Sequence, residues 1–371
     1  MAGIYVHIPF CKSKCRYCDF ASFPDKLCFA ESYMACVYRE MAMRKVELKG
    51  YDFDTLYIGG GTPSVIDENY IAMLVAAARK NFNLKENAEI TIEMNPGTVS
   101  AKKIETYLKC GINRFSVGLQ TAVDSQLAEL GRIHNLKEFL LCTKLLKDRN
   151  FSVDVMIGLK DQTVADIEKT IETAAYSGAK HISMYALSPE DGTPIYTDYL
   201  NGELPDGDEV AGMYEAGVEK LKVLGFDRYE VSNFCKKGFE SSHNLNYWRR
   251  GDYIGFGVAA SSCINNVRFT NTFDLDEYFK CILSGHLAVK DREEIDKTGQ
   301  EEEFIMLALR TSRGLDLKEF EKLFNENFLD KYAIALQKVT GYIEVNDGFL
   351  KIKDRFLFIQ NSIMVEFLQA V

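Results

Sequence analysis

The residues of this chain best suited to chemistry are three cysteines near its N-terminus, Cys11, Cys15 and Cys18. They lie in one short polar loop that follows directly after the apolar run 4–8. Three thiolates in such a loop form a soft ligand set that suits iron–sulfur or zinc. A [4Fe–4S] cluster normally takes four cysteines, so three would leave one iron open to a small molecule.

The alternatives to a cluster are a redox Cys-x-x-Cys pair and an incomplete zinc site. Either alternative leaves Cys11 without a role, and no second Cys/His pair follows at a suitable spacing. The remaining cysteines of the ten are scattered, and a chain of 371 residues needs no disulfides to be stable. The cysteines therefore predict a [4Fe–4S] cluster in the reducing cytoplasm.

Composition and the N-terminal sequence limit where the protein can reside and what it can bind. The N-terminus has no basic flank followed by a long apolar run, and no apolar stretch is long enough for a membrane span. A soluble, unsecreted protein is therefore expected. The formal net charge of −10 provides no general basic field, which argues against a nucleic-acid partner.

Alternating elements must position the cysteine loop. Helical patterns over 67–82, 100–110, 135–149 and 163–177 lie between short apolar runs. Strands that alternate with helices predict right-handed crossovers and a parallel α/β sheet. Six strands are predicted, at 4–8, 55–59, 89–94, 114–118, 153–158 and 181–187.

The pattern changes after the sixth strand. A helix is expected at 208–224, which ends a core region at 1–225, and an irregular, aromatic-rich connecting segment follows at 226–289. The segment 290–371 is mostly helical, with a hairpin predicted around Asn346-Asp347-Gly348. Helices followed by a hairpin and a last helix predict a small winged-helix-like domain.

The cysteine loop, YVHIPFCKSKCRYCDF, resembles the radical S-adenosylmethionine superfamily. Within it, the chain is similar to the oxygen-independent coproporphyrinogen oxidase family and its close relatives, the HemW haem chaperones. The resemblance covers essentially the whole chain and implies a partial (β/α)6 TIM-like barrel. It also implies that S-adenosylmethionine binds the open iron of the cluster.

Polar and glycine residues at the ends of successive strands are candidates for the rest of this site. The run 59–63, Gly-Gly-Gly-Thr-Pro, follows the second strand and can present bare backbone donors to a polar ligand. In barrels, polar groups at strand carboxyl ends point into the site. The resemblance implies contacts to S-adenosylmethionine from Tyr5, Gly60, Gly61, Thr62, Glu93, Gln120, Arg132 and Asp154, with Tyr17 and Ala186 beside the cavity.

Two features distinguish chaperone from oxidase. The oxidases have a further cysteine two residues after the third cluster cysteine, where this chain has Phe20. Residues 243–248, His-Asn-Leu-Asn-Tyr-Trp, resemble the His-Asn-x-x-Tyr-Trp element of the haem chaperones. A neutral imidazole can ligate haem iron, so His243 is a candidate haem ligand; the alternative is a packed loop in which His243 only bonds its neighbours.

The leading hypothesis is a haem chaperone that binds haem and transfers it to acceptor haemoproteins. It would use the cluster, S-adenosylmethionine and an electron donor. A coproporphyrinogen III oxidase or a haem-modifying radical enzyme is the main alternative, and a tRNA-modifying radical enzyme is a third. A peripheral membrane contact and a dimer stay open.

Overall fold

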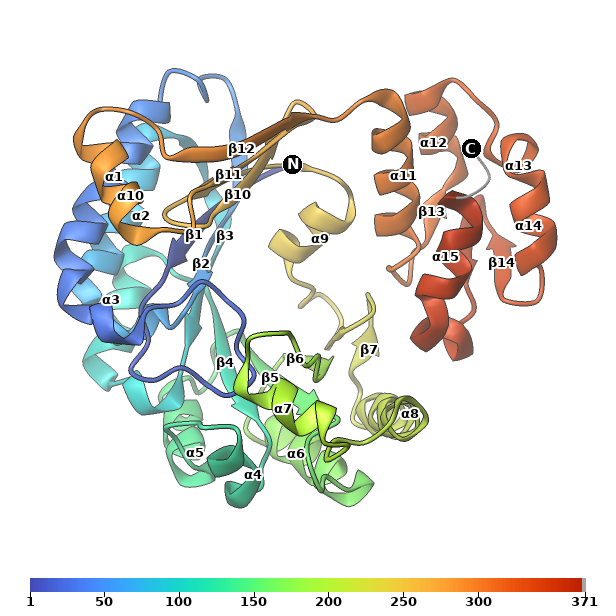
Figure 1. Cartoon of the computed structure of the whole chain (residues 1–371), viewed down its shortest axis with the longest axis horizontal. Helices are drawn as coiled ribbons and strands as arrows, with labels where there is room; N and C mark the ends of the chain where they lie inside the picture. The colour runs from blue at the N-terminus through green and yellow to red at the C-terminus, as the bar shows by residue number, and fades with distance from the viewer. Residues whose placement is uncertain (369–371) are drawn as a thin grey trace.

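The computed structural model describes residues 1–368, and its centre is one curved sheet of twelve strands (Figure 1). Six consecutive strands pair in parallel, in chain order. They are β1 (Ala2–Ile8), β2 (Asp52–Gly60), β3 (Asn83–Met94), β4 (Arg114–Gln120), β5 (Phe151–Ile157) and β6 (His181–Ala186). Each contains or overlaps a run predicted as a strand, so the predicted βα alternation is confirmed.

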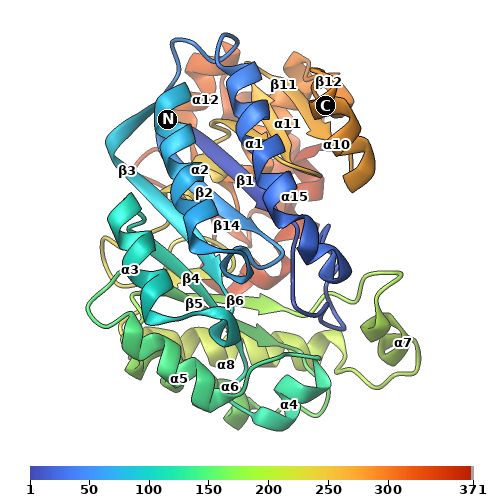
Figure 2. The ribbon, with the colours of Figure 1, turned by 90° about the vertical axis from the view of Figure 1, so that its left-hand side faces the viewer.

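Helices cover the outer face of these strands (Figure 2). They are α1 (Ala30–Arg44), α2 (Glu68–Asn81), α3 (Ala101–Cys110), α4 (Asp124–Glu129), α5 (Leu136–Leu145), α6 (Val164–Tyr176) and α8 (Gly207–Val223). Helix α7 (Pro194–Leu200) lies apart from them, beside the cysteine loop, where Ile195 N donates to Arg16 O at 3.1 Å. Local sequence fixes where they begin: Asn135 and Glu138 form a capping box at α5, and Thr163 and Asp166 form one at α6. None of the helices within residues 1–368 is both long enough and apolar enough to cross a membrane.

The strands divide their side chains between two environments. In β1, Ile4, Val6 and Ile8 are fully buried in the main hydrophobic core, whereas Tyr5 and His7 line a cavity on the inner face. Alternate residues of a strand point to opposite faces of the sheet, so apolar contacts hold the outer helices and polar groups collect inside.

The segment after α8 continues the sheet, and the expectation of an irregular connection there was wrong. It contains β7 (Asp227–Arg228), β8 (Asn233–Cys235), α9 (Ser242–Trp248), β9 (Asp252–Phe256), β10 (Ser261–Ile264), β11 (Val267–Asn271), α10 (Leu275–Leu283) and β12 (Val289–Glu294). Strand β9 pairs in parallel with β1, and β8 pairs antiparallel with β6. These strands are short, which hides their alternation. Asn265 and Asn266, both at positive φ, were the available hairpin signal between β10 and β11.

The C-terminal unit has its own hydrophobic core. Its elements are α11 (Lys297–Ala308), β13 (Leu315–Asp316), α12 (Leu317–Phe324), α13 (Phe328–Lys331), α14 (Ala333–Val339), β14 (Ile343–Asn346), β15 (Phe349–Ile352) and α15 (Gln360–Leu368). The predicted hairpin is confirmed: Asp347 and Gly348 form its turn, both at positive φ. The strands pair in the order β13-β15-β14.

The large sheet does not close on itself. Its order runs from β12 to β7, and these two end strands do not pair with each other. Helix α9 and the C-terminal unit lie at the open side (Figure 1). Arg228 of β7 forms a 2.6 Å ion pair with Asp354. The backbone of Glu230 forms an isolated antiparallel β-bridge with that of Thr311. The fold is therefore a partial (β/α)6 barrel whose open side is flanked by the C-terminal unit.

Candidate functional site

A cavity of about 560 Å³ lies inside the barrel at the carboxyl ends of its parallel strands. Twelve of the residues predicted to form a site line this cavity: Cys11, Cys15, Cys18, Tyr17, Gly60, Gly61, Thr62, Glu93, Gln120, Arg132, Asp154 and Ala186. They come from strands β2 to β6, from the loops after β1 and β2, and from the segment after α4. The carboxyl ends of parallel strands meet at one rim, which is why residues so far apart in the chain converge.

Three consecutive glycines, Gly59 to Gly61, lie at the carboxyl end of β2, and each position excludes a side chain. A Cβ on Gly59 would lie 2.9 Å from the Glu93 carboxyl carbon, and one on Gly60 would lie 2.6 Å from the His7 ring. A Cβ on Gly61 would lie 3.0 Å from the Cys11 sulfur. Gly60 also has φ of 113°, a conformation that favours glycine. The loop thus brings bare backbone against the cysteine loop.

Glu93 and Asp154 place two carboxyl groups inside the cavity. Glu93 accepts hydrogen bonds from the Tyr57 hydroxyl at 2.7 Å and from the Gly60 amide at 3.0 Å. Burial raises the pKa of Glu93 to about 7, and the nearby Asp154 carboxylate adds to this rise. Burial also raises the pKa of Asp154 to about 6, although Ser116 donates a hydrogen bond to it at 3.2 Å. A cationic ligand group would stabilise both carboxylates.

Gln120 and Arg132 carry buried polar atoms without protein partners. The register of β4 against β5 shifts between Gly118 and Gln120, and Gln120 adopts φ of 66°. Such a bulge re-aims a side chain at the end of a strand. Gln120 Oε1 and Arg132 Nε have no hydrogen-bond partner. Buried polar groups are normally paired, so these two atoms indicate a polar ligand in the cavity.

The cysteine loop is fixed to the barrel by backbone and side-chain contacts. Arg16 N donates to Leu130 O at 3.0 Å, and Cys11 Sγ lies 3.4 Å from Thr62 Oγ1. Arg132 Nη1 lies 3.5 Å from Cys15 Sγ and 3.4 Å from the Tyr17 hydroxyl. Within residues 1–368, no three His, Cys, Asp or Glu side chains converge closely enough to hold a single metal ion. The thiols therefore share one cavity without forming a single-ion site.

The floor of the cavity contains polar residues that the sequence analysis missed. They are Tyr57, Arg114, Ser116, Ser152, His181, Ser183 and Tyr185. Every second position of β4, β5 and β6 is involved, as in Ser152 and Asp154 or His181 and Ser183. This alternation was the available signal. It was overlooked because the intervening residues make each strand look continuously apolar.

Two predicted site residues lie elsewhere. Tyr5 lines a second cavity; its hydroxyl is 2.9 Å from His7 Nδ1 and its ring stacks on Tyr57. His243 is buried and lines neither cavity. Its Nδ1 lies 2.7 Å from Thr55 Oγ1 and its Nε2 lies 2.9 Å from the Tyr247 hydroxyl. These contacts match the packed arrangement that was the alternative, and ligation of haem iron by His243 stays a prediction.

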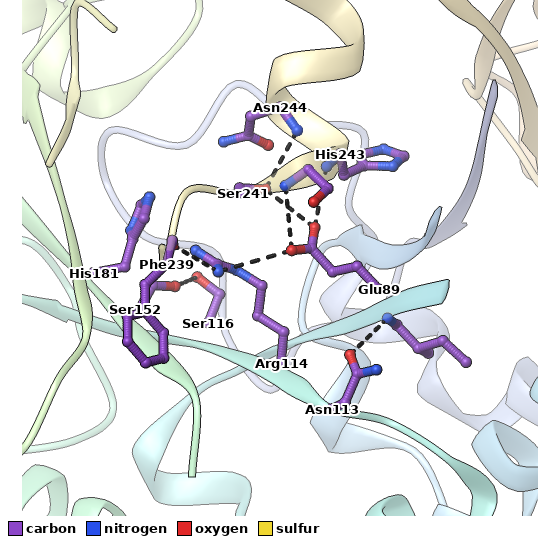
Figure 3. Close-up of polar contacts among 12 residues, drawn as sticks. Glu89, Asn113, Arg114, Ser116, Ser152, His181, Phe239, Ser241, His243 and Asn244 are labelled. Atoms are coloured by element: carbon purple, nitrogen blue, oxygen red, sulfur yellow. Dashed lines mark hydrogen bonds and ion pairs between the residues drawn. The ribbon is translucent and has the colours of Figure 1, made fainter. Parts of the chain in front are cut away.

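The start of α9 is anchored to the barrel by a carboxylate from β3 (Figure 3). Glu89 accepts hydrogen bonds from the amides of Ser242 at 3.2 Å and His243 at 3.0 Å. A carboxylate at a helix N-terminus satisfies amides that have no partner within the helix. Arg114 lies beneath it, 3.8 Å from Glu89 and bonded to the Phe239 carbonyl at 3.0 Å. The His-Asn-x-x-Tyr-Trp element therefore begins at a fixed point on the sheet.

The fold and the cysteine cavity define a class of protein, and comparison with known proteins agrees with it. Residues 5–174 match the family model of the radical SAM superfamily, and residues 295–359 match that of the HemN C-terminal domain. Coproporphyrinogen III oxidase (HemN) from Escherichia coli has the same fold, with a TM-score of 0.87, 19% identity, and coverage of 100% of this chain and 90% of that chain. Membership of the radical SAM superfamily implies a [4Fe–4S] cluster and S-adenosylmethionine.

Sequence relatives narrow this class to one family. Heme chaperone HemW of Bacillus subtilis (strain 168) is 31% identical over 99% of this chain and 99% of its own length. Heme chaperone HemW of Buchnera aphidicola subsp. Schizaphis graminum (strain Sg) is 32% identical, covering 99% of this chain and 98% of its own. That of Escherichia coli (strain K12) is 37% identical over 70% and 69%. The chain belongs to the HemW family.

The raised pKa of Glu93 predicts a pH-dependent stability of the cofactor-free protein. Its pKa is 4.5 ordinarily and about 7 in the fold, so the folded state favours the protonated carboxyl. This contribution is fully present below about pH 4.5 and is lost as the pH rises towards 7. Glu93→Gln should flatten this part of the pH profile by at most about 3 kcal/mol, since one pKa unit corresponds to about 1.4 kcal/mol. Urea unfolding at several pH values measures it; a profile identical to that of the wild type would contradict the assignment.

The burial of His243 predicts a structural effect for its removal. His243→Ala deletes the contacts to Thr55 and Tyr247, so the free energy of unfolding should fall by roughly 2 kcal/mol. The exposed His286 provides the matched control, and His286→Ala should change stability by less than about 0.5 kcal/mol. At saturating haem, the absorption spectrum should be the same in both variants. A changed haem spectrum in His243→Ala with unchanged stability would identify His243 as the iron ligand.

Proposed function

We propose that this protein is a haem chaperone that binds haem and transfers it to acceptor haemoproteins in the cytoplasm. The observation that carries this proposal is its identity of about one third, over nearly the full length, to proteins named heme chaperone HemW. The same proposal includes an electron donor that reduces the cluster. The match spans both the barrel and the C-terminal unit.

The cluster and S-adenosylmethionine belong in the cysteine cavity. Cys11, Cys15 and Cys18 would each hold one iron of a [4Fe–4S] cluster, which fits thiols that share a cavity but do not converge on one point. When bound and reduced, this cofactor pair supplies one-electron chemistry. A zinc site fits less well, because about four donors would have to converge on one ion.

The chain's own residues would orient S-adenosylmethionine. Glu93 and the loop at Gly60 and Gly61 would hold its amino group, because a buried carboxylate stabilises a neighbouring cation. The unpartnered atoms of Gln120 and Arg132 would bond its polar groups. Arg132 would also place a positive charge beside the thiolate of Cys15, which favours the anionic cluster.

Phe20 favours the chaperone over the coproporphyrinogen oxidase. It stands where the oxidases have a further cysteine, and it is a large aromatic residue with 67% of its surface exposed at the edge of the cavity. An aromatic face at this point can contact an apolar ligand but cannot act as a thiol. Decarboxylation of coproporphyrinogen remains the alternative that an assay must distinguish.

The cluster assignment predicts a selective loss of iron. Reconstitution of the wild-type chain without oxygen should give one cluster, and replacing Cys11, Cys15 and Cys18 by Ala should abolish it, because their thiolates are its ligands. Cys28→Ala is the matched control, since this cysteine is exposed and lies outside the cavity. Iron and sulfide analysis measures the result. Wild-type iron content in the triple variant would overturn the assignment.

The chaperone assignment predicts binding without turnover. The wild-type chain should bind haem stoichiometrically, as followed by absorbance, because it is a carrier of haem. Under reducing, anaerobic conditions with S-adenosylmethionine, it should not convert coproporphyrinogen to protoporphyrinogen, since Phe20 replaces the oxidases' cysteine. Multiple-turnover decarboxylation would make it a coproporphyrinogen oxidase instead.

A further inference from the structure

A second cavity, of about 550 Å³, lies beside the cysteine cavity and is unexplained by the cluster or by S-adenosylmethionine. Asp19 and Phe20 line both cavities, so the cysteine loop separates them. Strands β9 to β11 form one wall of the second cavity, and α11 of the C-terminal unit forms another through Glu303 and Leu307. Its volume falls within the range of small-molecule sites, about 300–1,000 Å³.

Two arginines in this cavity share one carboxylate. Arg250 Nε donates to Glu303 Oε2 at 2.8 Å, and Arg268 Nη2 donates to Glu303 Oε1. Glu303 therefore bridges two guanidinium groups, each of which has the planar geometry that binds carboxylates in pairs. Arg250 Nη2 is buried and has no partner. Asn266 accepts from Arg250 Nη1 at 2.8 Å, and Glu293 accepts from Arg268 Nη1 at 3.1 Å. The unpartnered Arg250 Nη2 is therefore the donor that leaves room for a further anion.

The backbone holds Arg250 in an uncommon conformation. Its φ is 54°, in the left-handed region that few residues other than glycine adopt. Asn246 enforces it, because its carbonyl accepts from Gly251 N at 2.8 Å and its side chain donates to Asp252 O at 2.9 Å. Such outliers persist where the surroundings over-determine them and often mark functional sites. The His-Asn-x-x-Tyr-Trp element thus positions the arginine that follows it.

The other walls of the cavity are aromatic. Tyr247 and Tyr253 meet edge to face with ring centroids 4.8 Å apart, and the largely exposed Phe20 and Phe273 contribute to the lining. Besides the arginines and Glu303, the acidic and basic side chains that line this cavity are Asp19 and His7. A flat apolar ligand that carries carboxylates on one edge would satisfy both the rings and the arginines.

We infer that this second cavity is the haem site, in which Arg250 and Arg268 bind the propionate carboxylates, and that Glu303 is an internal carboxylate that occupies both arginines until haem displaces it. This inference rests on the proposed haem-chaperone function. It assigns recognition of haem to its propionates, and it couples haem binding to the contact between α11 and the sheet. Displacement of Glu303 removes two ion pairs that join the C-terminal unit to the barrel.

The test compares haem with haem dimethyl ester, which has the same ring and iron but no free carboxylates. Both ligands are titrated into the full-length chain and followed by absorbance. The Arg250→Gln/Arg268→Gln variant should bind haem at least about tenfold more weakly and the ester equally well, because charge-assisted hydrogen bonds are lost. Glu303→Gln should bind haem several-fold more tightly, since the neutral amide competes less well for the arginines. Arg313→Gln is the control, because this exposed arginine lies outside both cavities.

Each result supports or overturns the inference. An unaltered haem affinity in the double variant would overturn it, and so would an equal loss for haem and for the ester, which indicates a purely structural role. Weaker or unchanged haem binding by Glu303→Gln would overturn the displacement of Glu303, because it would mean that this carboxylate only holds α11 against the sheet and does not compete with haem. Failure of the wild-type chain to bind haem or its ester would instead overturn the proposed function, which distinguishes the two failures.

Discussion

The contact between Glu89 and the first turn of α9 is the constraint on which the interior of this protein depends. A parallel sheet that does not close leaves one side of its polar interior open, and α9 lies at that side. A short helix gains little stability from its own hydrogen bonds, so its position must come from outside it. Glu89 bonds its first amides, and Thr55, which pairs with Glu89 in the sheet register, bonds His243.

Short local contacts fix the residues that follow the first turn of α9. His243 holds the Tyr247 hydroxyl, Tyr247 packs against Tyr253, and the backbone turn after α9 orients Arg250. The wall of the second cavity is therefore built outward from the barrel strands and not from the C-terminal unit. The two ring nitrogens of His243 thereby join the sheet to the cavity wall.

The parallel α/β sheet could be predicted from local pattern, whereas the partial barrel and the cofactor contacts of the cysteine cavity were expected from the family resemblance. The six strands were visible as apolar runs, and their carboxyl ends had to meet, which places Glu93 beside Asp154. For His243 the packed alternative could be stated from the sequence, but its partner Thr55 could not, because that residue is 188 positions away. Likewise, the ion pairs of Glu303 join two units whose packing leaves no trace in local periodicity.

The two cavities differ in how their charges are balanced, and this difference suits two kinds of ligand. The cysteine cavity holds the buried carboxyls of Glu93 and Asp154 with raised pKa values, so a cationic group there is stabilised by the protein. In the second cavity two guanidinium groups share the carboxylate of Glu303, and the buried Nη2 of Arg250 has no partner, so an anion would find a free donor there. Because Phe20 lines both, a ligand in one cavity contacts the same loop that carries the three cysteines.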